Sequence, residues 1–195
     1  MTHKSTLWIV RTALMLALLV VAQFAGKLIP AGAAVLGPMS LTQLITGSLV
    51  NLVLIVTAAT VGAWSGITVG VLSSVLALIL GIQAQPIITP AVALGNVVIV
   101  LVVWIFFTLA EKNNQKPLGL FGILGVVVGA AAKTGFLWLA VPALLKLIPE
   151  MKPKQAETLT LMFSYPQLAT ALIGGLLALL IIPTVKRALG NRAVQ

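Results

Sequence analysis

Charged side chains are scarce in this chain of 195 residues: 8% of the residues are Asp, Glu, Lys or Arg, whereas 60% are apolar. A soluble domain of this length carries roughly a quarter charged residues. The chain therefore lacks the polar surface that keeps a soluble domain in solution. The simplest explanation is that lipid surrounds most of the protein.

Residues that commonly carry catalysis or bind metals are also rare. Cysteine is absent, which excludes disulfides, thiolate metal sites and thiol catalysis. Histidine occurs once, as His3, and the three acidic residues, Glu111, Glu150 and Glu157, all lie at the edges of apolar runs. We therefore expect neither a metal site nor a cofactor.

Positive charge exceeds negative charge, giving a net charge of +9. The Lys and Arg residues lie mostly at the ends of apolar runs, where such residues contact lipid headgroups and set orientation. Nucleic-acid binding requires instead a basic face with polar or aromatic neighbours. We therefore expect the lipid bilayer, and no nucleic acid, as the partner of these charges.

Six apolar runs have the length of membrane-spanning helices, which need about 20 residues each. The predicted helices are 7–29, 41–62, 66–82, 86–110, 118–148 and 157–185. The first run is too long for the core of a signal peptide and lacks a clean cleavage site, so it is interpreted as a retained helix. The sequence thus predicts an all-α integral membrane bundle of six transmembrane helices, forming one domain over residues 1–195.

Glycine, proline and small polar residues indicate where these helices turn. A tight turn is predicted at 63–65, between the second and third helices. Pro142 is the predicted place for the long fifth run to tilt or break. Tyr165 and Pro166 should disturb the sixth helix just before Gln167.

Six spans place both termini on one side of the membrane, and the distribution of basic residues indicates which side. With the termini inside, seven basic residues face the cytoplasm (Lys4, Arg11, Lys112, Lys116, Lys186, Arg187, Arg192) and four face outward (Lys27, Lys146, Lys152, Lys154). Basic residues accumulate on the cytoplasmic side of membrane proteins. The sequence therefore predicts cytoplasmic termini.

Lys133 is the exceptional residue, because it lies in the middle of the fifth apolar run and no acidic residue lies within any run to neutralise it. A lysine at the centre of a membrane helix costs about 2.5–3.5 kcal/mol on insertion scales. Three interpretations remain open. The side chain could reach the interface or bond backbone carbonyls, line a water-accessible pocket for an anionic or carbonyl-bearing ligand, or contact a partner protein.

Other polar side chains lie at a similar predicted depth. Asn51, Asn96 and Gln167 each lie ten residues from the outer end of their helices, and Trp138 lies ten residues before Ile148. At 1.5 Å per residue this places all four about 15 Å below the outer face. Gln43 could reach the mouth of the same pocket. These side chains could also simply bond neighbouring helices, but together with Lys133 they favour a pocket for an anionic or neutral ligand, with Phe136 and Phe163 nearby.

Ala13 and Ala17 form a small-xxx-small pair in the first helix, extended by Ala22 and Gly26. Such spacing lets another helix approach closely. Taken alone, the pair favours packing within the chain, because alanine is frequent in membrane helices.

The size, the six predicted spans and several stretches together resemble the substrate-binding S components of energy-coupling factor (ECF) vitamin transporters. The resemblance covers nearly the whole chain. The stretches that carry it are Ala13-xxx-Ala17, the Gly/Pro-containing first outer loop, 44–51, Gly95-Asn96 and 167–175.

This resemblance implies a high-affinity binding subunit for a vitamin or vitamin precursor in a bacterial plasma membrane. It implies a ligand site near the outer face, and an Ala13/Ala17 face that docks onto a transmembrane coupling subunit with two ATPases beneath. It further implies that the subunit reorients in the membrane to release its ligand inward. The chain itself has no Gly-x-x-x-x-Gly-Lys-[Ser/Thr] loop for ATP. No specific ligand follows from the resemblance.

Three other functions stay open at this point. A stand-alone secondary transporter of a small organic solute would normally use an intramembrane acid, and none is present. A structural or assembly protein of a membrane complex needs no pocket. An enzyme would require a base, nucleophile or metal, for which Lys133 with Ser164 or Tyr165 is the available set; we expect no enzymatic activity.

Overall fold

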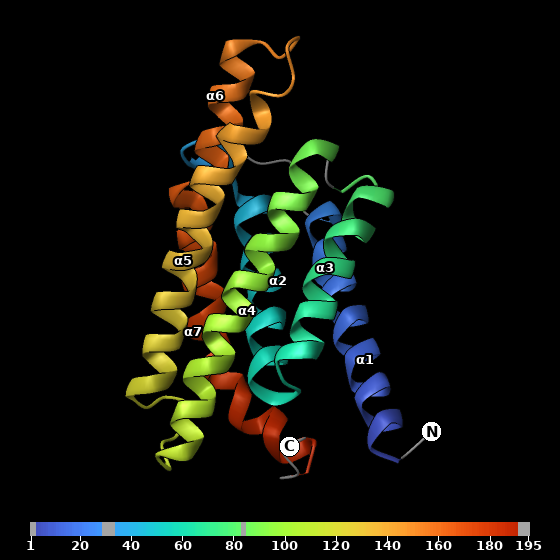
Figure 1. The fold of residues 1–195 in the computed structure, drawn as a ribbon, viewed down its shortest axis with the longest axis vertical. Coiled ribbons are helices and arrows are strands. Elements are labelled where there is room, and N and C mark those ends of the chain that lie inside the picture. Colours follow the sequence, from blue (N-terminus) through green and yellow to red (C-terminus); the bar gives the residue numbers. More distant parts are fainter. Residues whose placement is uncertain (1–2, 29–33, 83–84, 191–195) are drawn as a thin grey trace.

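The computed structural model describes residues 3–28, 34–82 and 85–190. The chain folds into an elongated bundle whose long helices run roughly along its longest axis (Figure 1). In chain order the elements are α1 (His3–Ala25), η1 (Gly26–Leu28), β1 (Ala34–Leu36), β2 (Met39–Ser40), α2 (Leu41–Thr60), α3 (Ala63–Ile79), η2 (Pro86–Ile88), α4 (Thr89–Lys112), α5 (Leu120–Leu145), α6 (Pro153–Met162) and α7 (Tyr165–Ala188).

Within the described residues, the helices are long and apolar enough to cross a membrane at five places: Ser5–Ala25, Leu41–Thr60, Pro86–Lys112, Leu120–Leu145 and Pro153–Ala188. The last of these includes both α6 and α7. Helix α3 is apolar but shorter, with 17 residues. Large apolar side chains cover the outside of the bundle, among them Leu139, Leu176 and Leu180. An apolar exterior around a helical bundle defines an all-α membrane protein that passes through the bilayer several times.

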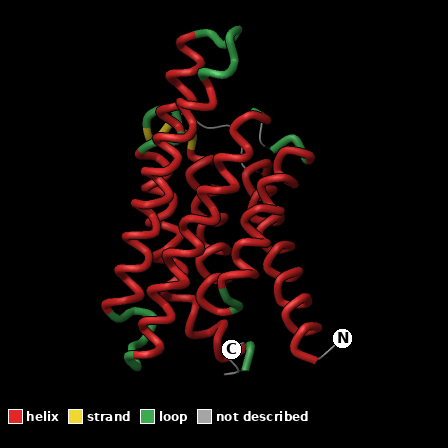
Figure 2. The backbone as a smooth tube through the Cα atoms, viewed as in Figure 1, coloured by secondary structure: helices red, strands yellow, loops and turns green. Residues whose placement is uncertain are grey.

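The start of α1 and the end of α7 lie at the same end of the bundle (Figure 1). The chain termini themselves, and Arg192, lie outside the described residues. At the opposite end, α6 projects beyond the other helices, and the short β1–β2 hairpin lies among the loops (Figures 1 and 2). The bundle therefore has one end that carries the terminal helices and one end that carries the hairpin and α6.

Helix α2 begins at a capping box. The Ser40 side chain accepts a hydrogen bond from the backbone N–H of Gln43, and the Gln43 side chain accepts one from the backbone N–H of Ser40. This reciprocal arrangement satisfies two amides that a helix start otherwise leaves unpaired. The preceding antiparallel hairpin, which the sequence analysis did not predict, turns at Gly37, whose φ of +56° suits glycine.

The turn between α2 and α3 was predicted at 63–65, and this prediction is wrong. The turn consists of Val61 and Gly62, and Ala63 already begins α3. Gly62 has a φ of +116°, which side-chain-bearing residues rarely adopt, so the glycine determines where the chain reverses.

Of the two predicted outcomes at Pro142, a break does not occur, because α5 continues through Pro142 to Leu145, whereas a tilt there stays a prediction. The neighbours Val141 and Leu145 are buried in an apolar cluster with Ile88 and Ala91, and this packing holds the last turn in place. A proline removes a single backbone donor, so a well-packed helix can continue past it.

The predicted helix 157–185 is two helices, α6 and α7, separated at Phe163 and Ser164. The predicted disturbance by Tyr165 and Pro166 occurs, with Pro166 in the first turn of α7, where proline is tolerated. The interruption leaves α6 with no buried residue of its own, projecting from the bundle.

Candidate functional site: a buried lysine below a cavity

Lys133 lies inside the bundle with 3% of its side chain exposed. Its Nζ donates hydrogen bonds to Asn51 Oδ1 at 2.7 Å and to Asn96 Oδ1 at 2.9 Å. The three side chains come from α5, α2 and α4. The lysine thus neither faces lipid nor bonds backbone carbonyls; two neutral amide oxygens hold it.

Further hydrogen bonds determine how both asparagines are oriented. Asn51 Nδ2 donates to Gly47 O and to Thr170 Oγ1, and Asn96 Nδ2 donates to Gly70 O and to Ser74 Oγ. Backbone carbonyls only accept and an ammonium only donates, so each amide can satisfy its neighbours in one orientation alone. The resulting network, which we call the Lys133 network, links α2, α3, α4, α5 and α7.

Glycines let the helices approach closely enough to form this network. A Cβ on Gly174 of α7 would lie 2.3 Å from Ser48 O and 2.9 Å from Asn51 Cβ. A Cβ on Gly70 of α3 would lie 3.1 Å from Asn96 Cβ. Small residues at helix interfaces are the usual means of close packing in membranes.

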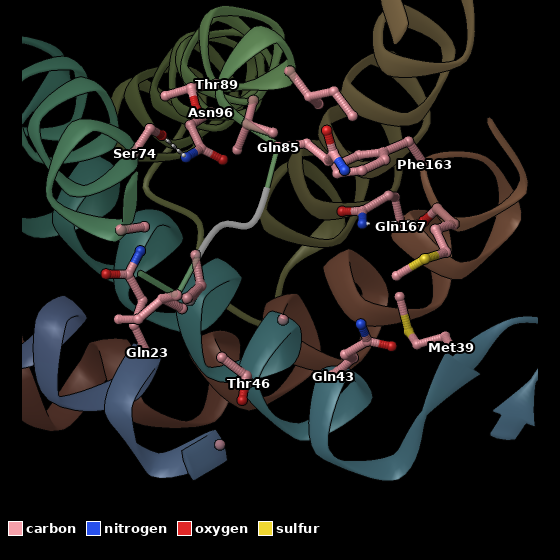
Figure 3. A pocket seen from close by; sticks show the side chains of 18 of the residues that line it. Gln23, Met39, Gln43, Thr46, Ser74, Gln85, Thr89, Asn96, Phe163 and Gln167 are labelled. Atoms are coloured by element: carbon pink, nitrogen blue, oxygen red, sulfur yellow. Dashed lines mark hydrogen bonds between the residues drawn. The ribbon is translucent and has the colours of Figure 1, made fainter. Parts of the chain in front are cut away.

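A cavity of about 450 Å³ lies next to the Lys133 network, on the side toward the β1–β2 hairpin and α6. Figure 3 shows its lining side chains arranged around an open centre, on several helices. Its size falls in the range of small-molecule sites. The described residues lining it are Gln23, Gly26, Met39, Thr42, Gln43, Thr46, Gly47, Val50, Asn51, Ser74, Ala77, Gly81, Ile82, Gln85, Ile88, Thr89, Val92, Asn96, Lys133, Leu159, Met162, Phe163 and Gln167.

This lining places the cavity at the end of the bundle that carries the hairpin and α6, because Met39 belongs to β2 and Leu159 and Met162 belong to α6. Lys133 is the single charged residue among the described lining residues.

Three lining residues have buried polar atoms without a hydrogen-bond partner within the described part of the chain: Gln23 Oε1, Thr46 Oγ1 and Thr89 Oγ1. Buried polar atoms are nearly always paired, with protein, water or a ligand.

Most of the predicted site residues surround this cavity. Lys133, Asn51, Asn96, Gln43 and Gln167 all line it. Lys133 bonds both Asn51 and Asn96. Gln43 lies near Met39, and Gln167 lies near Phe163 (Figure 3).

The structure does not bring Trp138 to this cavity: its side chain is 60% exposed on the outside of α5. Trp138 follows Lys133 by five residues, which corresponds to a rotation of about 140° around a helix. Similar depth along the helix axis therefore does not place Trp138 at the cavity, because Trp138 and Lys133 lie on different faces of α5. Phe136 likewise packs into the cluster around Ile88 and Leu137, while Phe163 does line the cavity.

Sequence reasoning missed several lining residues, including Gln23, Thr46, Gln85 and Thr89. Gln23 could have been found, because it is a polar residue within an apolar run, the same signal that identified Asn51. Gln85 and Thr89 lie at the start of the fourth run, where polar residues are common and carry no signal.

The structure does not pair Lys133 with Ser164 or Tyr165, the residues considered above as a possible enzymatic set. Ser164 Oγ donates to Leu161 O, and the Tyr165 hydroxyl lies against Gly37. Within the described residues, no three His, Cys, Asp or Glu side chains come together as a metal site.

The protein is a membrane-embedded helical bundle with a solute-sized cavity next to a hydrogen-bond network. This architecture is that of a membrane solute-binding protein. The comparisons with known proteins define the family. The family of substrate-specific components of ECF transporters matches residues 8–186, so the chain belongs to this family. It is thus the substrate-specific subunit of an importer. This family consists of transport proteins and is not a family of enzymes. No curated protein and no solved structure gave a match.

The Ala13 and Ala17 side chains are exposed on the outside of α1. Ala22 and Gly26, a second pair four residues apart further along the chain, are buried against the rest of the bundle. The small-residue stripe therefore divides into an outward half and an inward half. Only the outward half remains available to another helix.

Proposed function

We propose that this protein captures a small vitamin-like solute, anionic or neutral, in the cavity above the Lys133 network. It would then deliver the solute across a prokaryotic plasma membrane together with a coupling subunit and a pair of ATPases. The observation that carries this proposal is a solute-sized cavity lined by the buried Lys133 and by no acidic side chain among its described lining residues. The family supplies the transport context.

The charge of the cavity discriminates among solutes. A cationic group held about 5 Å from the Lys133 ammonium would be repelled by about 3 kcal/mol at an effective dielectric of 20. A difference of that size corresponds to more than a hundredfold in affinity. An acceptor such as a carboxylate or a carbonyl would instead meet the third N–H of the ammonium, because two of the three already donate to Asn51 and Asn96.

The charge distribution and the fold together support one proposed orientation in the membrane. With six spans and cytoplasmic termini, the hairpin, α6 and the cavity would lie toward the outside, where an importer meets its solute. Lys152 and Lys154, at the start of α6, would face outward, and Lys186 and Arg187, at the end of α7, would face the cytoplasm.

The exposed Ala13/Ala17 face of α1 is the proposed docking surface for the coupling subunit. Its small side chains would let a partner helix approach closely. Ala17→Leu should weaken co-purification of the coupling subunit while leaving solute binding unchanged. Leu18→Ala, an exchange at the next exposed position of the same helix, is the matched control and should retain the complex.

Reconstitution tests the proposal as a whole. The co-purifying solute is first identified by mass spectrometry of the protein isolated from its membrane. In proteoliposomes, the chain with its coupling subunit and ATPases should accumulate that solute when ATP is supplied, and Lys133→Met should reduce both binding and uptake. Accumulation by the chain alone would instead identify a stand-alone carrier, and unchanged binding by Lys133→Met would remove the ammonium from the site.

A further inference from the structure

Two glutamines in the upper part of the cavity have side-chain amides of fixed orientation. Gln43 Oε1 accepts the backbone N–H of Ser40 at 2.9 Å, as part of the capping box of α2. An N–H can only be met by the oxygen of the carboxamide, so the amide cannot be flipped. Its Nε2 donor is consequently left for the cavity, and Figure 3 shows this nitrogen directed toward the open centre.

Gln167 is fixed in the opposite sense. Its Nε2 donates to Met162 O at 3.3 Å, a carbonyl at the last turn of α6. A carbonyl can only be met by the amide nitrogen, so Oε1 is the atom left for the cavity. Figure 3 shows this oxygen pointing into the open centre. The cavity thus presents a fixed donor from α2 and a fixed acceptor from α7.

Apolar side chains surround this donor–acceptor pair. Phe163 lies beside Gln167, and Met39 lies beside Gln43 (Figure 3). Met162 and Leu159 of α6 also line the cavity. Aromatic and thioether groups of this kind pack well against the face of a flat ring.

We propose that the site selects a flat nitrogen heterocycle that carries an N–H next to a C=O, as in a lactam, an imide or a cyclic urea. The ring carbonyl would accept from Gln43 Nε2, and the ring N–H would donate to Gln167 Oε1. This inference rests on the proposed solute-capture function and adds to it the chemical class of the solute. It concerns the ring alone, whatever charge the rest of the solute carries.

Other ligand edges fit this pair less well. A carboxylate has acceptors only, so it would satisfy Gln43 and leave Gln167 Oε1 facing another acceptor. An amine or ammonium group has the reverse problem at Gln43. A buried polar group that loses its partner weakens binding, so the pair should discriminate by at least about tenfold.

The test uses three flat bicyclic compounds of similar size. Quinazolin-4(3H)-one has the N–H next to the carbonyl, 3-methylquinazolin-4-one lacks that N–H, and 2-naphthoate has a carboxylate. Binding to the full chain in nanodiscs is measured by titration calorimetry up to millimolar concentrations. Quinazolin-4(3H)-one should bind at least about tenfold more tightly than its methyl derivative.

Variants assign the discrimination to the two glutamines. In Gln167→Met, the ratio of affinities for the two quinazolinones should fall to within about twofold, because the acceptor for the ring N–H is gone. Gln155→Met, the same exchange at an exposed position of α6 that does not line the cavity, should keep the wild-type ratio. Gln43→Glu retains an oxygen for the capping box and replaces the donor by an acceptor, so it should lose quinazolin-4(3H)-one binding without unfolding α2.

Equal binding of the two quinazolinones, a wild-type ratio in Gln167→Met, or no binding of quinazolin-4(3H)-one would overturn this inference. The proposed capture function fails differently. If 2-naphthoate binds and Lys133→Met abolishes that binding, the cavity captures solutes through its ammonium and only the ring class is wrong. If the co-purifying solute binds equally well to Lys133→Met, the capture site itself is misassigned.

Discussion

The Lys133 network makes a quantitative prediction about stability. Asn51→Leu replaces the amide by a side chain of similar branched shape and removes the acceptor of the 2.7 Å bond from Lys133. A hydrogen bond to a charged group contributes about 1.5–3 kcal/mol. The ammonium would remain buried with one partner fewer, so the full loss should appear. For a chain of this length, the expected fall in Tm is about 3–12 °C.

The same exchange should cost much less once the ammonium is gone. In Lys133→Met, the Asn51 oxygen has already lost its donor, so Asn51→Leu then removes only the Nδ2 bonds to Gly47 O and Thr170 Oγ1, which it removes in the wild-type background as well. The two changes should therefore couple by about 1–3 kcal/mol in a double-mutant cycle. Tm is measured by tryptophan fluorescence of the purified chain in nanodiscs.

Asn113→Leu is the matched control, because Asn113 is exposed at the end of α4 and its amide bonds only to Leu109 O of its own helix. It should change stability by less than about 0.5 kcal/mol. An equal loss for Asn51→Leu in the wild-type and Lys133→Met backgrounds would refute the reasoning. The buried lysine would then contribute nothing specific through Asn51.

Three further predictions follow from packing and exposure. Gly174→Ala should destabilise the protein by about 1–3 kcal/mol in thermal unfolding, because its Cβ would meet the α2 backbone, whereas Gly135→Ala, where a Cβ would meet nothing within 4 Å, should be neutral or stabilising by up to about 1 kcal/mol. Phe163→Ala should weaken binding of the co-purifying solute about tenfold in calorimetry, while Trp138→Phe should leave it within about twofold; the reverse order would place the solute outside the cavity. The Lys186–Glu111 ion pair is partly exposed, so its coupling in a double-mutant cycle should stay below about 1 kcal/mol, and a larger value would mean that lipid or a partner shields it.

The sequence was sufficient for the parts of the fold that depend on hydropathy. Runs of apolar residues placed the helices to within a few residues, because bilayer thickness and backbone hydrogen bonding leave few alternatives. Details controlled by single backbone positions were missed. The position of the turn is determined by Gly62 and not by the polar residue Ser65. Tertiary packing around Val141 and Leu145 stabilises α5 beyond Pro142.

The sequence predicted how deep in the bundle the site residues lie, but not which way their side chains point around each helix axis. Asn51, Asn96 and Lys133 were singled out by polarity within apolar runs, and the structure brings them together. Trp138 failed because an estimate of depth ignores rotation about the helix axis. The sequence did not predict that Lys133 would bond two asparagines. Hydrogen bonds between helices depend on which helix faces pack together, and here the close approach at Gly70 and Gly174 determines those faces.

The layer of side chains beneath Lys133 has a consequence for transport. One to three turns further toward the end with the terminal helices, Leu54, Ile99, Val126 and Leu179 are almost completely buried and belong to one apolar cluster. The protein interior is packed densely enough that such a layer leaves no passage for a solute or for water. The cavity is therefore closed at its base, and a bound molecule can leave on the far side only if helices separate or the whole subunit tilts in the bilayer. Either movement must separate densely packed side chains and therefore requires work.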